Sequence, residues 1–182
     1  IESGATMNGN KPEHVREAVP VISRLADMIG VRSFSSGVST DEDDQDSVIH
    51  AFKSLSDVPV ISMESAREHP CQGLADMLTI QEHLGVPRPR VTLAWAPHIK
   101  PLPKAVPNSF LLSSAAMGYD ITVAHPQGYE LASSVIQEAQ RMSQQTGGRI
   151  NFSHDLESAV KDTQVIYAKA WGPSSPLAPP PD

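Results

Sequence analysis

The sequence of 182 residues predicts an α/β fold built on parallel sheets. Short apolar runs, of the length typical of buried strands, alternate along the chain with amphipathic segments that have the period of helices. Alternation of this kind is typical of a parallel sheet that helices cover on both faces. The hydrophobic fraction of 40% is enough for a core, and because the aromatic fraction is only 5%, we expect that core to be aliphatic.

The first elements run from a helix to two strands. Apolar residues at helical spacing predict a helix over 12–28, with a kink at Pro20 because proline lacks the backbone N–H that a helix interior uses. A short strand follows and ends at Arg32. The alternation continues with a helix over 48–55 and a strand, "VPVIS", over 58–62.

A longer helix is predicted over residues 70–84. Pro70 suits the first helical position, which makes His69 the expected cap. The expected apolar face holds Leu74, Met77, Leu78 and Leu84, with Ile80 beside it. The motif "VPRPR" that follows reads as a joint between domains.

The alternation resumes after "VPRPR". We expect strands over 91–96, 119–126, 149–154 and 164–168, and helices over 110–117, 133–145 and 156–160. Asn108 or Ser109 is expected to cap the first of these helices, and Gly118 to end it. The predicted domains are residues 1–85, which include the linking helix 70–84, and residues 86–172, before a Pro/Ser-rich tail over 173–182.

Charge and composition argue against nucleic-acid, membrane and nucleotide-binding proteins. The formal net charge is −7, and the lysines and arginines are scattered rather than clustered. No apolar run approaches the roughly 20 residues that a membrane helix needs, and the sequence has no GxGxxG or Walker loop. The single cysteine excludes an internal disulfide and fits a reducing compartment. We therefore expect a cytoplasmic protein with no nucleic-acid or membrane partner.

Both ends of the sequence look cut. The chain opens at Ile1 without an initiator methionine or a visible signal peptide, and it stops within "WGPSSPLAPPPD". We therefore interpret the sequence as a fragment.

Five polar residues fall where a parallel sheet binds its ligands. In such sheets, ligands bind beyond the carboxyl ends of the strands. The residues at or just after predicted strand ends are Arg32, Glu64, His98, His125 and Lys169. These are the candidate site residues that topology alone predicts.

The motif "HPCQ", residues 69–72, marks a helix start that can bind an anion. The backbone N–H groups of Cys71 and Gln72 lie in the first turn and have no acceptor within the helix. Together with the helix dipole they favour a polar or anionic ligand, and His69 and Gln72 could add side-chain donors.

Other interpretations of this stretch are a metal site and a cysteine nucleophile. Neither HExxH nor a CxxC pair is present, so no metal is predicted. A helix start lowers the pKa of a thiol, but free cysteine is usually a small buried hydrophobe, and we expect Cys71 to be structural. A metal hydrolase using His69, His98 and His125, and a non-catalytic anion-binding α/β module, remain alternatives.

Several motifs together resemble one family. The motif "HPCQGLAD", preceded by a strand and a glutamate, resembles the carbamoyl-phosphate motif of the aspartate/ornithine carbamoyltransferase family. Three further segments resemble its N-acyl-ornithine branch: "GATMNGNKPEHVREAVPVISRLADMIGVRSF", "WAPHIKPLPKAVPNS" and "VIYAKAW". The resemblance covers the chain from about Gly4 to Gly172.

The resemblance implies a reaction and a role for each matched residue. A carbamoyl group would move from carbamoyl phosphate to the side-chain amine of N-succinylornithine or N-acetylornithine, in arginine biosynthesis, without a cofactor. Ornithine itself is the alternative acceptor. The implied catalytic residues are Arg32, His69 and Gln72, and the implied carbamoyl-phosphate ligands are these three with Pro70 and Cys71. The implied amino-acid ligands are Glu64, His98, Asn108 and Lys169, whereas His125 and Trp171 are expected to be structural.

The resemblance also implies an architecture. It implies two Rossmann-like domains, the first only partly present, in a homotrimer, with a knot in the second domain where a later segment passes through the Pro-rich loop. The family's Ser-x-Arg-Thr-Arg loop and its late "HCLP" loop are absent from this sequence, so we expect residues 1–182 alone to be inactive. The four residues "SARE" between Glu64 and His69 favour the succinyl substrate by resemblance.

Overall fold

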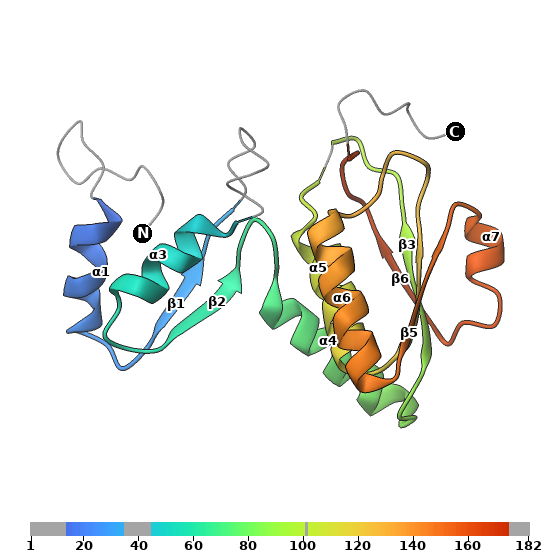
Figure 1. The fold of residues 1–182 in the computed structure, drawn as a ribbon, viewed down its shortest axis with the longest axis horizontal. Coiled ribbons are helices and arrows are strands. Elements are labelled where there is room, and N and C mark those ends of the chain that lie inside the picture. Colours follow the sequence, from blue (N-terminus) through green and yellow to red (C-terminus); the bar gives the residue numbers. More distant parts are fainter. Residues whose placement is uncertain (1–13, 35–44, 101, 175–182) are drawn as a thin grey trace. The chain divides into compact units, whose positions relative to one another are not determined.

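The computed structural model describes residues 14–34, 45–100 and 102–174 (Figure 1). The chain forms two compact units that divide between Cys71 and Gln72. Both units contain parallel strands and helices, which confirms the predicted α/β class. Within the described part of the chain, no helix combines the length and the apolarity that crossing a membrane requires.

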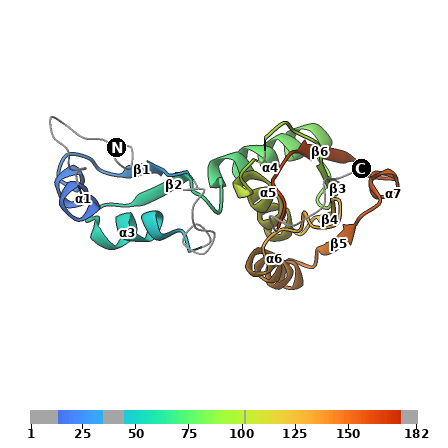
Figure 2. The ribbon, with the colours of Figure 1, turned by 90° about the horizontal axis from the view of Figure 1, so that it is seen from above.

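The described part of the first unit pairs two parallel strands with two helices (Figure 2). Its elements are α1 (Val15–Ser23), β1 (Ile29–Arg32), α3 (Ser47–Leu55) and β2 (Val60–Glu64). Its buried core consists of Val19, Ile29, Val31 and Phe52. The register of the two strands changes near their carboxyl ends, since Val31 pairs with Ser62 but Arg32 pairs with Glu64. Met63 is therefore the extra residue of a β-bulge, a feature that re-aims side chains and is frequent beside active sites.

Helix α1 is shorter than predicted. It begins after His14, whose ring accepts a hydrogen bond from the backbone N–H of Arg16 at 3.2 Å, and it ends at Ser23 rather than at residue 28. The predicted end is wrong because β1 begins at Ile29, and the intervening residues make the turn into that strand. Pro20 lies inside the helix, as predicted, and the predicted start at residue 12 lies outside the described residues.

The second unit is a four-stranded parallel sheet in the order β5-β4-β3-β6. Its strands are β3 (Arg90–Trp95), β4 (Asp120–Ala124), β5 (Arg149–Ser153) and β6 (Val165–Lys169). Its helices are α4 (Pro70–Leu84), α5 (Ala105–Ala116), α6 (Ser133–Thr146) and α7 (Leu156–Ala159). Figure 1 shows α5 and α6 on one face of the sheet and α7 on the other, so helices lie on both faces, as predicted.

The core of the second unit lies between the sheet and α5. Apolar strand residues such as Val91, Leu93, Ile121 and Val123 are almost fully buried there. The expectation of an aliphatic core holds only in part, because Phe110, Tyr119 and Trp171 are the largest fully buried side chains.

Helix α4 has the predicted bounds but buries a different face. Its buried residues are Gly73, Met77 and Ile80, whereas Leu74 is 73% exposed and Leu78 is 53% exposed. The cause is Gly73, where an added Cβ would lie 2.5 Å from the hydroxyl of Ser113. The missing side chain lets α4 approach α5 along the Gly73 face. The predicted apolar face is therefore wrong at Leu74 and Leu78, whereas Met77 is buried and Leu84 packs against the core, as predicted.

Helix α5 begins earlier than predicted. It starts at Ala105, and the backbone N–H of Asn108 donates to the carbonyl of Lys104 at 2.9 Å. Asn108 and Ser109 are therefore inside the helix, and the prediction that one of them caps it is wrong. Proline tolerates the first turn, where its missing N–H is not needed, so Pro107 does not delay the start of the helix. Gly118 follows the helix with φ +72°, which confirms its predicted place at the end.

Candidate functional site

The carboxyl ends of β1 and β2 bring Arg32, Glu64 and His69 together. The Nε of Arg32 donates to Oε2 of Glu64 at 2.8 Å. The Nε2 of His69 lies 3.6 Å from the same carboxylate oxygen, which is an ion-pair distance when the imidazole is protonated. A single oxygen of Glu64 thus faces two groups that can bind an anion.

Exposure differs among these three side chains. The Glu64 side chain is 13% exposed, that of His69 is 23% exposed, and that of Arg32 is 57% exposed. The guanidinium carbon of Arg32 lies 4.8 Å from the centre of the Phe34 ring, a cation–π distance. The carboxylate is therefore partly withdrawn from water, while the guanidinium remains accessible to a ligand.

A tight turn sets the position of His69. The backbone N–H of Ser65 donates to the carbonyl of Glu68 at 2.6 Å, and the backbone N–H of Glu68 donates to the Ser65 hydroxyl at 3.0 Å. Ser65 itself is buried. The four residues between Glu64 and His69 thus form a closed turn, which carries the chain from β2 to the start of α4.

Cys71 differs from its predicted environment. It is exposed rather than buried, so its expected role as a small buried hydrophobe is wrong. Its sulfur lies 3.9 Å from the carbonyl oxygen of Ser62, a weak contact. The first turn of α4 leaves this small side chain at the surface because the face that packs is that of Gly73.

In the second unit, Gln72 lies in the first turn of α4. Its side-chain amide Nε2 donates to Oδ1 of Asp76 at 2.8 Å, one helical turn further on. Burial and the charge of the nearby Asp76 carboxylate both raise the pKa of Tyr167 of β6. Sequence reasoning did not single out Asp76 or Tyr167, although the spacing of four residues within "QGLAD" carries the first of these contacts.

The predicted amino-acid ligands of the second unit have different surroundings. Lys169 ends β6 and pairs in register with Trp95 at the end of β3. His98 is exposed in the loop after β3, where its Nδ1 accepts from the backbone N–H of Lys100 at 3.1 Å. Asn108 is only 3% exposed, within α5. Lys169 and His98 thus follow neighbouring strands, whereas Asn108 lies in the helix that comes next.

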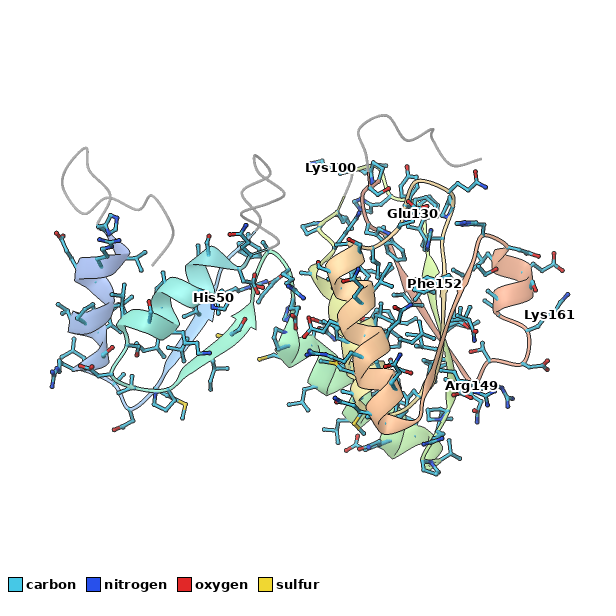
Figure 3. All side chains as sticks on the ribbon, viewed as in Figure 1. His50, Lys100, Glu130, Arg149, Phe152 and Lys161 are labelled. Atoms are coloured by element: carbon cyan, nitrogen blue, oxygen red, sulfur yellow. The ribbon has the colours of Figure 1, made fainter. Side chains whose placement is uncertain are left out.

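Three loops at the carboxyl end of this sheet are held together by hydrogen bonds. The Nζ of Lys104 donates to the carbonyl of Glu130 at 2.9 Å, and Nε1 of Trp171 donates to the carbonyl of Tyr129 at 2.7 Å. The backbone N–H of Gly172 donates to the carbonyl of Leu102 at 2.9 Å. These bonds connect the Pro-rich loop, the loop after β4 and the segment after β6. Figure 3 shows Glu130 at this end of the sheet.

Glu130 is the strongly perturbed carboxylate of this region. Burial alone would raise its pKa, but the backbone N–H groups of Glu130 and Gly128, the hydroxyl of Ser174 and the nearby His125 outweigh burial and lower the pKa to about 2. The Ser174 hydroxyl donates to Oε2 of Glu130 at 2.8 Å. His125 is 5% exposed with its Nδ1 2.9 Å from the carbonyl oxygen of Pro126, which fits its expected structural role.

A cavity of about 270 Å³ lies at the other end of the sheet. Arg90, Asp120 and Arg149, which begin β3, β4 and β5, contribute to its lining. Figure 3 shows Arg149 there, opposite Glu130. The cavity is therefore not at the carboxyl ends, where parallel sheets bind their substrates. In the described ranges, no three His, Cys, Asp or Glu side chains form a group that could hold a metal ion.

Comparisons with known proteins agree with this layout. The model of the carbamoyl-P binding domain of aspartate/ornithine carbamoyltransferase matches residues 1–82, and the model of the Asp/Orn binding domain of the same family matches residues 103–174. The chain is 42% identical over 170 residues to an N-succinylornithine carbamoyltransferase of Bacteroides thetaiotaomicron, covering 93% of this chain and 50% of that protein. It is 41% identical over 173 residues to an N-acetylornithine carbamoyltransferase of Xanthomonas campestris pv. campestris, covering 93% and 51%.

Solved structures lead to the same family. The structure of acetylornithine transcarbamylase complexed with acetylcitrulline superposes with a TM-score of 0.87 at 40% identity, covering 94% of this chain and 52% of that one. A mutant of N-acetyl-L-ornithine transcarbamylase complexed with carbamyl phosphate and N-succinyl-L-norvaline has a TM-score of 0.86, with the same identity and coverage. The chain spans about half the length of the curated relatives it matches. With two family domains matched in order and the parallel α/β fold in place, the chain belongs to the aspartate/ornithine carbamoyltransferase family.

Proposed function

We propose that the whole protein transfers the carbamoyl group of carbamoyl phosphate to the side-chain amine of an N-acyl-ornithine. The observation that carries this proposal is the cluster of Arg32, Glu64 and His69 at the helix start "HPCQ". An arginine, a histidine and the N–H groups of a helix start are the kinds of donor that an anionic phosphoryl substrate needs. The relatives named for this reaction support the same assignment.

The roles follow from the chemistry of the transfer. The amine nitrogen attacks the carbamoyl carbon, the bond from that carbon to the phosphate oxygen breaks, and phosphate leaves with the electron pair and takes up the proton that the amine loses. Arg32 binds the phosphate oxygens, because a planar guanidinium pairs with two oxygens at once. His69 donates to the carbamoyl oxygen, where negative charge develops, and Gln72 binds the carbamoyl amide. The backbone at Pro70 and Cys71 completes the anion-binding turn.

Glu64 has different partners before and after carbamoyl phosphate binds. Before substrate arrives, its Oε2 accepts from Arg32 at 2.8 Å. A phosphate group competes with this carboxylate for the guanidinium, and binding of carbamoyl phosphate then leaves Glu64 to the second substrate. Glu64, His98, Asn108 and Lys169 bind the acyl-ornithine. Support for Lys169 and His98 comes from their places after neighbouring strands, and support for Asn108 comes from the family resemblance.

N-succinylornithine is the proposed acceptor. The closed "SARE" turn between Glu64 and His69 favours it by resemblance. The identities to N-succinylornithine and N-acetylornithine enzymes are too similar, 42% and 41%, to decide between the two acyl groups. An ornithine carbamoyltransferase of Methanobrevibacter smithii is less similar, at 34% identity.

The assembly is proposed to follow the family. We infer a cytoplasmic homotrimer with a role in arginine biosynthesis, and a second domain knotted by passage of the segment after β6 through the Pro-rich loop. The bond from Gly172 to Leu102 is compatible with that passage. Residues 1–182 alone are proposed to be inactive, because they span about half of each relative. Formation of a citrulline derivative by residues 1–182 alone would contradict their proposed inactivity.

The test of the function is a substrate comparison. The whole protein is given carbamoyl phosphate with N-succinylornithine, N-acetylornithine or ornithine, and the carbamoylated product and phosphate are both measured. The proposal predicts the highest kcat/KM with N-succinylornithine. Binding of carbamoyl phosphate without turnover of any of the three amines would instead favour an anion-binding module.

A further inference from the structure

The start of α4 contains a side-chain relay behind Gln72. Nε2 of Gln72 donates to Oδ1 of Asp76 at 2.8 Å. The Asp76 carboxylate also lies beside the Tyr167 side chain, and its Oδ2 is buried with no hydrogen-bond partner among the described residues. The relay joins a residue of the "HPCQ" motif to a strand that ends two residues later at Lys169.

The chemistry of this relay determines which way the Gln72 amide is turned. An ionised carboxylate has only acceptors, so the amide must present its NH₂ group to Asp76. Because the amide is planar, its carbonyl oxygen then points away from Asp76. A neutral partner such as asparagine offers both a donor and an acceptor, and it would accept the amide in either orientation.

Tyr167 lies beside the carboxylate end of the relay. Its ring stacks on that of Phe110, with ring centres 4.2 Å apart and an interplanar angle of 24°, and Phe110 is fully buried. Burial and the charge of Asp76 both raise the pKa of Tyr167 above its ordinary value of 10.0. The phenol therefore stays protonated throughout the physiological pH range.

We propose that Asp76 is a positioning residue that turns the carbonyl oxygen of Gln72 toward the NH₂ group of carbamoyl phosphate. The carbamoyl NH₂ is a donor, so it requires an acceptor from the protein, and the relay presents the acceptor end of the amide. This inference rests on the proposed function, because it assigns the carbamoyl group to Gln72. An i,i+4 bond between glutamine and aspartate also stabilises a helix, so the experiment has to separate positioning from helix stability.

The experiment is a double-mutant cycle in the whole protein. Dissociation constants for carbamoyl phosphate and kcat/KM are measured for Asp76→Asn, Tyr167→Phe, Gln72→Ala and the double variant Gln72→Ala/Asp76→Asn, with thermal unfolding recorded for each. The control is Thr79→Ala, which removes another side-chain bond spanning one turn of α4, from the Thr79 hydroxyl to the carbonyl of Ala75 at 2.8 Å. The control is expected to leave carbamoyl-phosphate affinity unchanged.

We expect the effect of Asp76→Asn on carbamoyl-phosphate binding to require Gln72. Asp76→Asn should weaken carbamoyl-phosphate binding roughly tenfold, the effect of losing one hydrogen bond to substrate, and Tyr167→Phe should weaken it less. In the Gln72→Ala background, Asp76→Asn should have no further effect. Wild-type affinity in Asp76→Asn, or an undiminished effect in the Gln72→Ala background, would overturn the inference while leaving the proposed function intact. Absence of carbamoyl-phosphate binding by the wild-type protein would overturn the proposed function, and this inference with it.

Discussion

Arg32 and Glu64 are register partners at the ends of two parallel strands, and their side chains meet at 2.8 Å across a β-bulge. The extra residue of the bulge, Met63, brings Glu64 level with Arg32 at the strand ends. Without it, Arg32 would pair with Met63, and the glutamate would follow the paired residues. The bulge therefore assembles the ion pair at the carboxyl edge of the sheet.

Removal of the Arg32 charge should abolish productive phosphate binding. We expect Arg32→Ala to lower kcat/KM for carbamoyl phosphate by roughly 10²–10³, the cost of losing a charged donor that neutralises the leaving group. Steady-state kinetics of the whole protein measure this effect. The control is Arg24→Ala in the same unit, which breaks an exposed ion pair with Asp57 at 3.3 Å and should leave the kinetics unchanged. Equal effects of the two substitutions would argue against a substrate role for Arg32.

The two neighbours in "HPCQ" should behave differently. We expect His69→Ala to slow turnover by at least about 10², because the carbamoyl oxygen loses its donor as charge develops on it. Cys71→Ala should stay within about twofold of wild type, since an exposed thiol with only a weak contact to Ser62 supplies nothing that the transfer needs. The measurement is kcat at saturating carbamoyl phosphate. Loss of turnover in Cys71→Ala with normal turnover in His69→Ala would refute the anion-site interpretation.

Gly73 is predicted to be essential for the packing of α4 on α5. A Cβ at this position would lie 2.5 Å from the Ser113 hydroxyl and 3.3 Å from the Ser109 carbonyl. Overpacking typically costs about 1–3 kcal/mol, which exceeds the roughly 1 kcal/mol that alanine gains over glycine in a helix. We therefore expect Gly73→Ala to lower the free energy of unfolding, measured by denaturant titration. In the Ser113→Ala background the loss should be smaller, and an equal loss there would place the clash elsewhere.

Glu130 should make the second unit sensitive to acid. Its pKa is lowered from 4.5 to about 2 in the folded protein, so its stabilising effect is present above pH 4.5 and is lost as the pH falls toward 2. In this window the unfolded state binds up to one more proton at Glu130 than the folded state does. Glu130→Gln should therefore reduce the dependence of unfolding free energy on pH, and Ser174→Ala, which removes one donor, should reduce it partly. Denaturant melts from pH 5 to pH 3 measure these slopes, and identical slopes in wild type and Glu130→Gln would contradict the prediction.

The alternation of strands and helices was predictable because burial on both faces leaves a strong apolar pattern. The bounds of α4 and the termination of α5 before Gly118 follow from local rules for proline and glycine. The buried face of α4 was not predictable, because Leu74 and Leu78 fit helical spacing as well as Met77 and Ile80 do. Only the partner helix shows that Gly73 marks the side of closest approach.

In the candidate site too, local patterns predicted some features, whereas contacts between distant residues could not be predicted. Arg32, Glu64 and His69 were predicted from strand ends and from a motif, and the structure brings these three together. The contact of Asp76 with Tyr167 and the bond of Lys104 to the Glu130 carbonyl join residues far apart in the sequence, which no local pattern reveals. The β-bulge at Met63 also left no signal, since one extra residue in a short apolar strand does not disturb its composition.

The most direct test of the central claim is the carbamoyl-transfer assay on the whole protein with N-succinylornithine. Phosphate release and N-succinylcitrulline formation are followed together, in wild type and in Arg32→Ala. The account predicts equal amounts of both products in wild type and loss of both in the variant. Phosphate release without any carbamoylated amine, or wild-type transfer by Arg32→Ala, would contradict it.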